Sequence, residues 1–159
     1  MKGAFALKSD RDLYDKLLRD FAELKSNLTN SDAAFNFFVT AWHLLEWRYP
    51  KNKNSELRGR IRDSEPILQV CEHLAVGAKH FAPENSNLSA VSSTEETTGG
   101  LARPLVRPLV RPLARPLVQE PKLIAHLTGT AAETFGSKVD IEKLADETMR
   151  YWRGEYDPD

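Results

Sequence analysis

A proline recurs at every fourth position from Arg103 to Val118, where the sequence reads RPLV, RPLV, RPLA, RPLV. Proline lacks a backbone N–H and its ring clashes with the preceding turn, so this stretch is excluded from helix. The repeated loss of a donor also excludes an inner strand, which leaves a sheet edge or an extended polyproline-like segment. The stretch is therefore predicted to be an insert, and the core must come from the residues on either side.

Two functions are conceivable for the repeat itself: a proline-rich ligand for another domain, or an exposed basic and apolar strand that chaperones bind. Its prolines stand four apart, however, whereas the PxxP spacing puts two prolines on one face of a polyproline helix. We expect an inert, locally disordered expansion whose four arginines are the basic part of an otherwise acidic chain. The chain is expected to form a single helical domain, 1–159, that contains residues 83–121 as a loop and RPLV-repeat insert.

Outside the insert, apolar residues recur at three- or four-residue spacing, which predicts a mainly α fold, a bundle of about four helices. Short polar side chains cap the first free N–H groups of a helix, and the expected starts are Ser9, Ser31 or Asp32, Asp63 or Ser64, and Asp140. Pro50 and Pro83 are expected to stop the second and third helices. The stripes expected to share one core are Leu13/Leu17/Phe21, Phe35/Phe38/Trp42, Ile67/Leu74/Ala78 and Leu144/Trp152.

Three other segments are expected to be less regular. Residues 50–62 are polar and basic, which predicts a loop or a short ragged helix. Residues 83–100 are rich in Ser, Thr, Asn and Gly and predict a loop or a weak strand. The run from Lys122 to Thr128 alternates loosely and predicts one small strand element, closed by Gly129, before the last helix.

Composition excludes several classes of protein. A single cysteine, Cys71, can form neither an internal disulfide nor a Cys-rich zinc module, which indicates a reducing compartment. A formal net charge of -1, from 22 Lys and Arg against 23 Asp and Glu, lacks the basic bias of a dedicated nucleic-acid binder. Because no signal peptide and no membrane-spanning apolar run is recognisable, we expect a cytoplasmic protein with no membrane contact, and we expect no cofactor.

Two pairs of residues are candidate catalytic groups. His43 and Glu46 lie three apart on the aromatic helix, where an imidazole and a carboxylate can pair. Lys79 and His80 lie near the end of the third helix, where a histidine beside a lysine can bind a phosphate. If both pairs converge, His is the expected general base and Lys stabilises the anion. The plainer interpretation is that each pair satisfies polar groups at the boundary of the core.

His73 and His80 are candidate metal ligands on the third helix, next to Glu72. Two imidazoles and a carboxylate can hold Zn²⁺, but histidines seven apart are not a metal signature. We therefore expect no metal site and a solvated or hydrogen-bonded structural role for these side chains. Cys71 falls on the apolar stripe of the same helix, so it is expected to be buried, protonated and without chemistry.

Six cations lie within fifteen residues at the end of the aromatic helix, next to Trp47 and Tyr49. They are Arg48, Lys51, Lys53, Arg58, Arg60 and Arg62. Cations interleaved with aromatic rings favour weak contact with RNA or another polyanion. The alternative is a solvated loop whose charge is balanced by acidic neighbours such as Glu56 and Asp63.

Three segments resemble a loose set of small bacterial hypothetical proteins whose function is unassigned. They are FNFFVTAWHLLEW at 35–47, CEHLAVGAKHF at 71–81 and LADETMRYW at 144–152, and the distinctive residues are Gly77, Lys79, His80 and Phe81. The helical arrangement is also similar to HEPN domains, small helical bundles of bacterial toxin and defence systems, some of which cut RNA. Their signature of an Arg followed by a His after four to six residues is absent here, so no catalytic residue is carried over.

Two hypotheses for function follow. The first is a noncatalytic helical protein that binds a protein partner, in a mobile-element or defence setting that only the resemblance implies. The second is an HEPN-like phosphodiester-cleaving or RNA-binding protein that uses His43/Glu46 and Lys79/His80. The placement of the two pairs discriminates between these hypotheses, because catalysis requires both pairs to face one site.

Overall fold

The structure is a computed structural model that describes residues 7–79, 90–97 and 121–158. Within these ranges the chain forms six helices and a three-stranded antiparallel sheet. This confirms the mainly α fold with a small strand element, and it corrects the expected number of about four helices. The RPLV-repeat insert lies outside the described residues.

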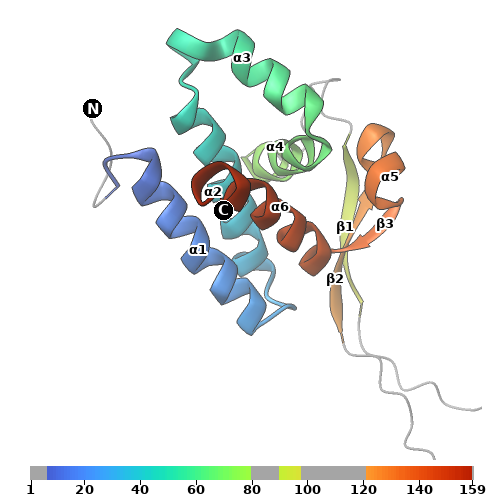
Figure 1. The fold of residues 1–159 in the computed structure, drawn as a ribbon. Coiled ribbons are helices and arrows are strands. Elements are labelled where there is room, and N and C mark those ends of the chain that lie inside the picture. The colour runs from blue at the N-terminus through green and yellow to red at the C-terminus, as the bar shows by residue number, and fades with distance from the viewer. Residues whose placement is uncertain (1–6, 80–89, 98–120, 159) are drawn as a thin grey trace, which may run out of the picture.

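Four helices make the body of the fold (Figure 1). They are α1 (Asp10–Ser26), α2 (Ser31–Arg48), α4 (Pro66–Lys79) and α6 (Ile141–Tyr156). α1 packs along α2, α2 also packs on α4, and α6 contacts all three of them. Ser9 caps α1 as predicted, by accepting the Asp12 N–H, and Asp140 is the N-cap residue of α6, although its side chain makes no capping hydrogen bond. α2 begins at Ser31 as predicted, but its cap is Asn30, whose side chain accepts the first N–H groups of the helix.

The core is built by the apolar faces of these helices. The largest fully buried side chains are Trp152, Tyr14, Phe37, Phe38, Leu17, Leu24, Leu44, Leu45, Leu68, Leu144, Met149 and Val70. Trp42 and Ile67 are buried as predicted, whereas Phe21 and Leu74 are only partly buried. The prediction for Phe35 is wrong, because this residue is 49% exposed and lies beside a hollow instead of against another helix.

α3 (Lys51–Ser64) is a helix in the segment predicted to be a loop or a short ragged helix. Asn54 interrupts its helical backbone, and none of its residues is buried. In Figure 1 it runs along the outside of the bundle at the top of the view. Salt bridges from Arg58 to Glu46 and from Arg62 to Glu72 join it to α2 and α4, so ion pairs supply contacts that an apolar face usually makes.

The boundary between α3 and α4 also differs from the prediction. Asp63 and Ser64 were the expected caps of the next helix, but both lie in the last turn of α3. Glu65 is extended and turns the chain, and α4 begins at Pro66. Proline suits this first helical position because the N–H that it lacks would have no partner there.

The sheet lies beside α4 and α6 and has the strand order β1-β2-β3. β1 (Val91–Thr97) and β2 (Lys122–Leu127) fall in the two segments where strands were predicted. The short helix α5 (Gly129–Phe135) and β3 (Lys138–Asp140) were not predicted. Gly129 has a φ of 57°, so this glycine begins α5 in a left-handed conformation that other residues rarely adopt.

Candidate functional site

The predicted pair of His43 and Glu46 forms on the outer face of α2. The His43 Nδ1 and Glu46 Oε2 atoms are 2.8 Å apart, and the His43 side chain is 52% exposed. The other carboxylate oxygen of Glu46 lies 3.8 Å from Arg58 of α3. Glu46 therefore links α2 to α3, and the arrangement agrees with a polar pair at the edge of the core.

His43 also lines a hollow of about 350 Å³ between α1 and α2. Lys16 and Thr40 line the same hollow, and both bond to the Asp20 carboxylate. No described residue of α4 reaches this hollow. The Lys79 side chain and all of His80 lie outside the described residues, so convergence of the two candidate catalytic pairs stays a prediction.

His73 joins α4 to the sheet. Its Nδ1 accepts a hydrogen bond of 3.2 Å from the Val91 N–H, which places the proton of the neutral ring on Nε2. Burial lowers the pKa of His73, so the ring is neutral at pH 7. Glu72, the carboxylate next in sequence, bonds to Arg62 at 2.9 Å. Within the described ranges, no three metal-ligating side chains come together.

Cys71 is fully buried, as predicted from its place on the apolar stripe. Its Sγ lies 3.6 Å from the hydroxyl oxygen of Thr148 on α6. Burial raises the pKa of the thiol to about 12, so Cys71 is protonated at neutral pH and is part of the core.

Arg48, the first cation of the predicted basic patch, is engaged within the fold. Its guanidinium carbon lies 4.7 Å from the centre of the Tyr156 ring. It also forms ion pairs with Asp10 at 3.6 Å and with Glu155 at 3.4 Å. Arg48 therefore joins the end of α2 to α1 and α6 and does not present a free charge.

The remaining five cations of the patch lie on α3 and divide into two groups. Arg58 and Arg62 are the residues that join α3 to the bundle, and their side chains are partly exposed, at 18% and 26%. Lys51, Lys53 and Arg60 are exposed, and they make no ion pair with any residue in the described part of the chain. Of the six cations of the patch, these three are available to a polyanion.

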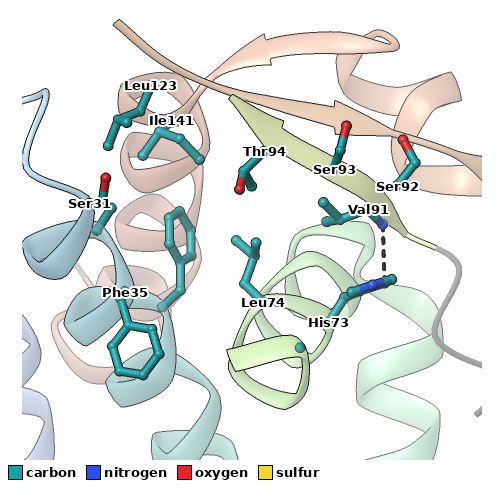
Figure 2. Close-up of a pocket in the computed structure, with 13 residues that line it drawn as sticks. Ser31, Phe35, His73, Leu74, Val91, Ser92, Ser93, Thr94, Leu123 and Ile141 are labelled. Atoms are coloured by element: carbon teal, nitrogen blue, oxygen red, sulfur yellow. Dashed lines mark hydrogen bonds between the residues drawn. The ribbon is translucent and has the colours of Figure 1, made fainter. Parts of the chain in front are cut away.

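A larger hollow, of about 480 Å³, lies where α2, α4 and the sheet meet (Figure 2). Among the residues that the structure describes, its lining contains no Asp, Glu, Lys or Arg and consists of Ser31, Ala34, Phe35, Phe38, His73, Leu74, Gly77, Val91, Ser92, Ser93, Thr94, Leu123 and Ile141. Figure 2 shows Val91 and Thr94 directed toward the hollow, and Ser92 and Ser93 directed away from it. Phe35 borders the hollow with half of its surface exposed.

This hollow has no counterpart among the predicted sites. Its residues come from segments far apart in the sequence, and apolar residues that line a hollow have the same spacing as residues that fill a core. One local signal was available in β1, where Ser92, Ser93 and Thr94 give the strand no second apolar residue to bury after Val91. The strand consequently leaves the core at that point.

Comparison with known protein families, with curated proteins and with solved structures finds no match to this chain. Among the described helices, none combines the length and the hydropathy that a membrane crossing requires.

Proposed function

We propose that this protein is a noncatalytic partner-binding protein that receives an apolar segment of a protein partner in the hollow between α2, α4 and β1. The observation that carries the proposal is the 49% exposure of Phe35 beside an uncharged hollow. Covering the rest of a half-exposed phenylalanine is worth about 1 kcal/mol of apolar burial. Aromatic side chains beside a cavity are typical anchors of protein interfaces.

The chemistry of the lining supports binding more than catalysis. Among the described lining residues His73 is the only one with a titratable side chain, and its Nδ1 already accepts a hydrogen bond from the Val91 N–H. The remaining polar side chains of the described lining are four hydroxyl residues, and Ser92 and Ser93 point away from the hollow (Figure 2). The hydroxyls of Ser31 and Thr94 are left to orient a ligand. A mostly apolar surface with a few hydroxyls is typical of a recognition site.

Selection of peptides tests the proposal. A random peptide library is selected on the full-length protein and depleted on the variant Phe35→Glu. We expect enriched peptides with uncharged apolar side chains, whose affinity for Phe35→Glu is at least about tenfold weaker because a charge then borders the hollow. The matched control is Leu57→Glu on α3, since Leu57 is the other exposed large apolar side chain, at 40%.

Circular dichroism establishes that both variants are folded. Binding must be retained by Leu57→Glu and lost by Phe35→Glu. Enriched peptides that bind Phe35→Glu as tightly as the wild type would place recognition elsewhere and overturn the proposal, and so would a selection that enriches nothing.

A second proposed function is weak polyanion contact at α3, favoured by the exposed charges of Lys51, Lys53 and Arg60, which form no ion pair within the described ranges. Fluorescence anisotropy with labelled single-stranded RNA tests it. We expect affinity that falls with salt and is lost in Lys53→Glu/Arg60→Glu. A variant with the same charge change at exposed residues elsewhere, Lys8→Glu/Lys143→Glu, is the control. Equal loss in both variants would show a general charge effect and no site on α3.

A further inference from the structure

β1 is hydrogen bonded to β2 along one side, and no other described strand pairs with its second side. In an antiparallel ladder, the N–H and C=O of one residue point to the same side, and successive residues alternate. Lys122 faces β1, because its N–H and its C=O both bond to the Thr97 hydroxyl. Leu127 faces β3, because its N–H bonds to Ser137. The main chains of Lys122, Ile124 and His126 therefore point toward β1.

The register between the strands then shows which β1 residues face outward. In this register, Thr97 is paired with Lys122, Glu95 with Ile124 and Ser93 with His126. These three β1 residues bond to β2, and the residues between them alternate with them. Thr94 and Glu96 consequently direct their main-chain N–H and C=O away from the sheet, at its edge.

The start of β1 provides an independent check on this direction. Val91 precedes an irregularity in the register, and its N–H points out of the sheet to bond with His73 of α4. At Val91 the outer side of β1 is therefore occupied by a hydrogen bond to α4. From Ser92 to Glu96 the strand is exposed.

The open edge and the hollow belong to the same part of the surface. The Thr94 side chain points toward the hollow (Figure 2). Glu96, two residues further on, lies on the same face of β1 and stands opposite Leu123, which lines the hollow. Glu96 is exposed and has no ion-pair partner in the described part of the chain. Within the described residues, a lining without Asp, Glu, Lys or Arg is thus followed along β1 by an exposed carboxylate that forms no ion pair.

We propose that the partner binds as an extended strand added to the edge of β1, with main-chain hydrogen bonds to Thr94 and Glu96. Its alternate side chains enter the hollow and are uncharged, and a lysine or arginine of the partner lies beside Glu96. This inference rests on the proposed function and specifies the occupant of the same site. In strand addition, main-chain bonds supply affinity and a pocket for alternate side chains supplies specificity. The free carboxylate of Glu96 favours a cation through charge complementarity.

The probe is the most enriched peptide of the selection described above, labelled with fluorescein and titrated with the full-length protein. Glu96→Pro removes the outward N–H, and a strand edge tolerates proline where the missing donor faces outward. We expect Glu96→Pro to bind at least about tenfold more weakly at an unchanged melting temperature. Glu96→Gln keeps the N–H and is expected to lose only the charge contact, about threefold. Glu95→Pro removes a bond to β2 and is expected to lower the melting temperature.

A second measurement uses the wild-type protein and therefore does not depend on the folding of a variant. Methylation of single backbone nitrogens of the probe is expected to weaken binding at every second residue and to spare the residues between. Strand addition is overturned if methylation shows no alternation along the probe. It is also overturned if the probe binds Glu96→Pro as tightly as the wild type but binds Phe35→Glu more weakly, and this second outcome leaves the proposed function intact. If Phe35→Glu also binds like the wild type, the proposed function fails with it.

Discussion

The rings of Tyr14 and Tyr156 stack with their centroids 4.5 Å apart and their planes 10° from parallel, which joins α1 to the last turn of α6. Each phenol also donates to a carboxylate beside the other ring: Tyr14 to Asp157 at 2.7 Å, and Tyr156 to Asp10 at 2.8 Å. Arg48, from the end of α2, lies over the Tyr156 ring. One cluster therefore ties three helices together through residues from both ends of the described chain.

Two substitutions at Tyr156 separate the contributions of this cluster to stability. Tyr156→Phe keeps the stacked ring and loses the hydrogen bond to Asp10, so we expect a loss of about 1 kcal/mol in the free energy of unfolding. Tyr156→Ala also removes the ring from its contacts with Tyr14 and Arg48, and we expect a loss of about 2–4 kcal/mol. Urea denaturation at neutral pH measures both, and equal losses would contradict a contribution from stacking.

The same cluster predicts a loss of stability at alkaline pH. Burial, with the hydrogen bond to Asp157, raises the pKa of Tyr14 from its ordinary value of about 10 to about 12. The folded state thus retains a proton that the unfolded chain releases, so this stabilisation is complete below pH 10 and is lost as the pH rises toward 12. We expect the urea midpoint to fall between about pH 9 and pH 11 in the wild type and to fall less in Tyr14→Phe. An equal fall in both proteins would contradict this assignment.

The long helices were predictable because the spacing of apolar residues alone shows which face of a helix is buried. α3 has no such face, since none of its residues is buried and its anchors, Glu46 and Glu72, lie on other helices. Its helical state therefore depends on contacts in space that spacing does not show. α5 is only seven residues long, and Gly129 indicated the end of a strand more strongly than the start of a helix.

The candidate sites likewise include some that the sequence could predict and some that it could not. The pairing of His43 with Glu46 was predictable because residues three apart on a helix are neighbours in any fold. The partner of His73 is a backbone N–H eighteen residues away, and periodicity contains no information on it. To predict the hollow, the sequence would have had to show that no other element covers Phe35. The spacing of apolar residues shows which residues share a face of a helix, but it does not show where along the helix the neighbouring elements end.

The attachment of α3 leads to a prediction on local stability. Arg62 forms an ion pair with Glu72 that joins α3 to α4, whereas Arg60 is exposed on the same helix and pairs with no acidic residue that the structure describes. Arg62→Met is expected to remove about 1 kcal/mol of local stability, which corresponds to about fivefold faster hydrogen exchange in α3. Exchange in α2 should not change. Arg60→Met is the matched control, and similar exchange in the two variants would show that the Arg62 ion pair does not hold the helix.

The contrast between Trp42 and Phe35 tests the position of the core and the openness of the hollow together. Both are aromatic residues of α2, yet Trp42 is 8% exposed and Phe35 is 49% exposed. Trp42→Ala should lower the free energy of unfolding by about 3–5 kcal/mol, the cost of removing a buried aromatic ring. Phe35→Ala should cost less than about 1 kcal/mol, because half of the ring is already in water and alanine favours helix more than phenylalanine does.

Urea denaturation of the two variants gives the comparison. A loss under about 1 kcal/mol for Trp42→Ala would show that this face is not central. A loss for Phe35→Ala as large as that for Trp42→Ala would mean that the hollow is already filled in the free protein, and a partner would then gain nothing by covering Phe35.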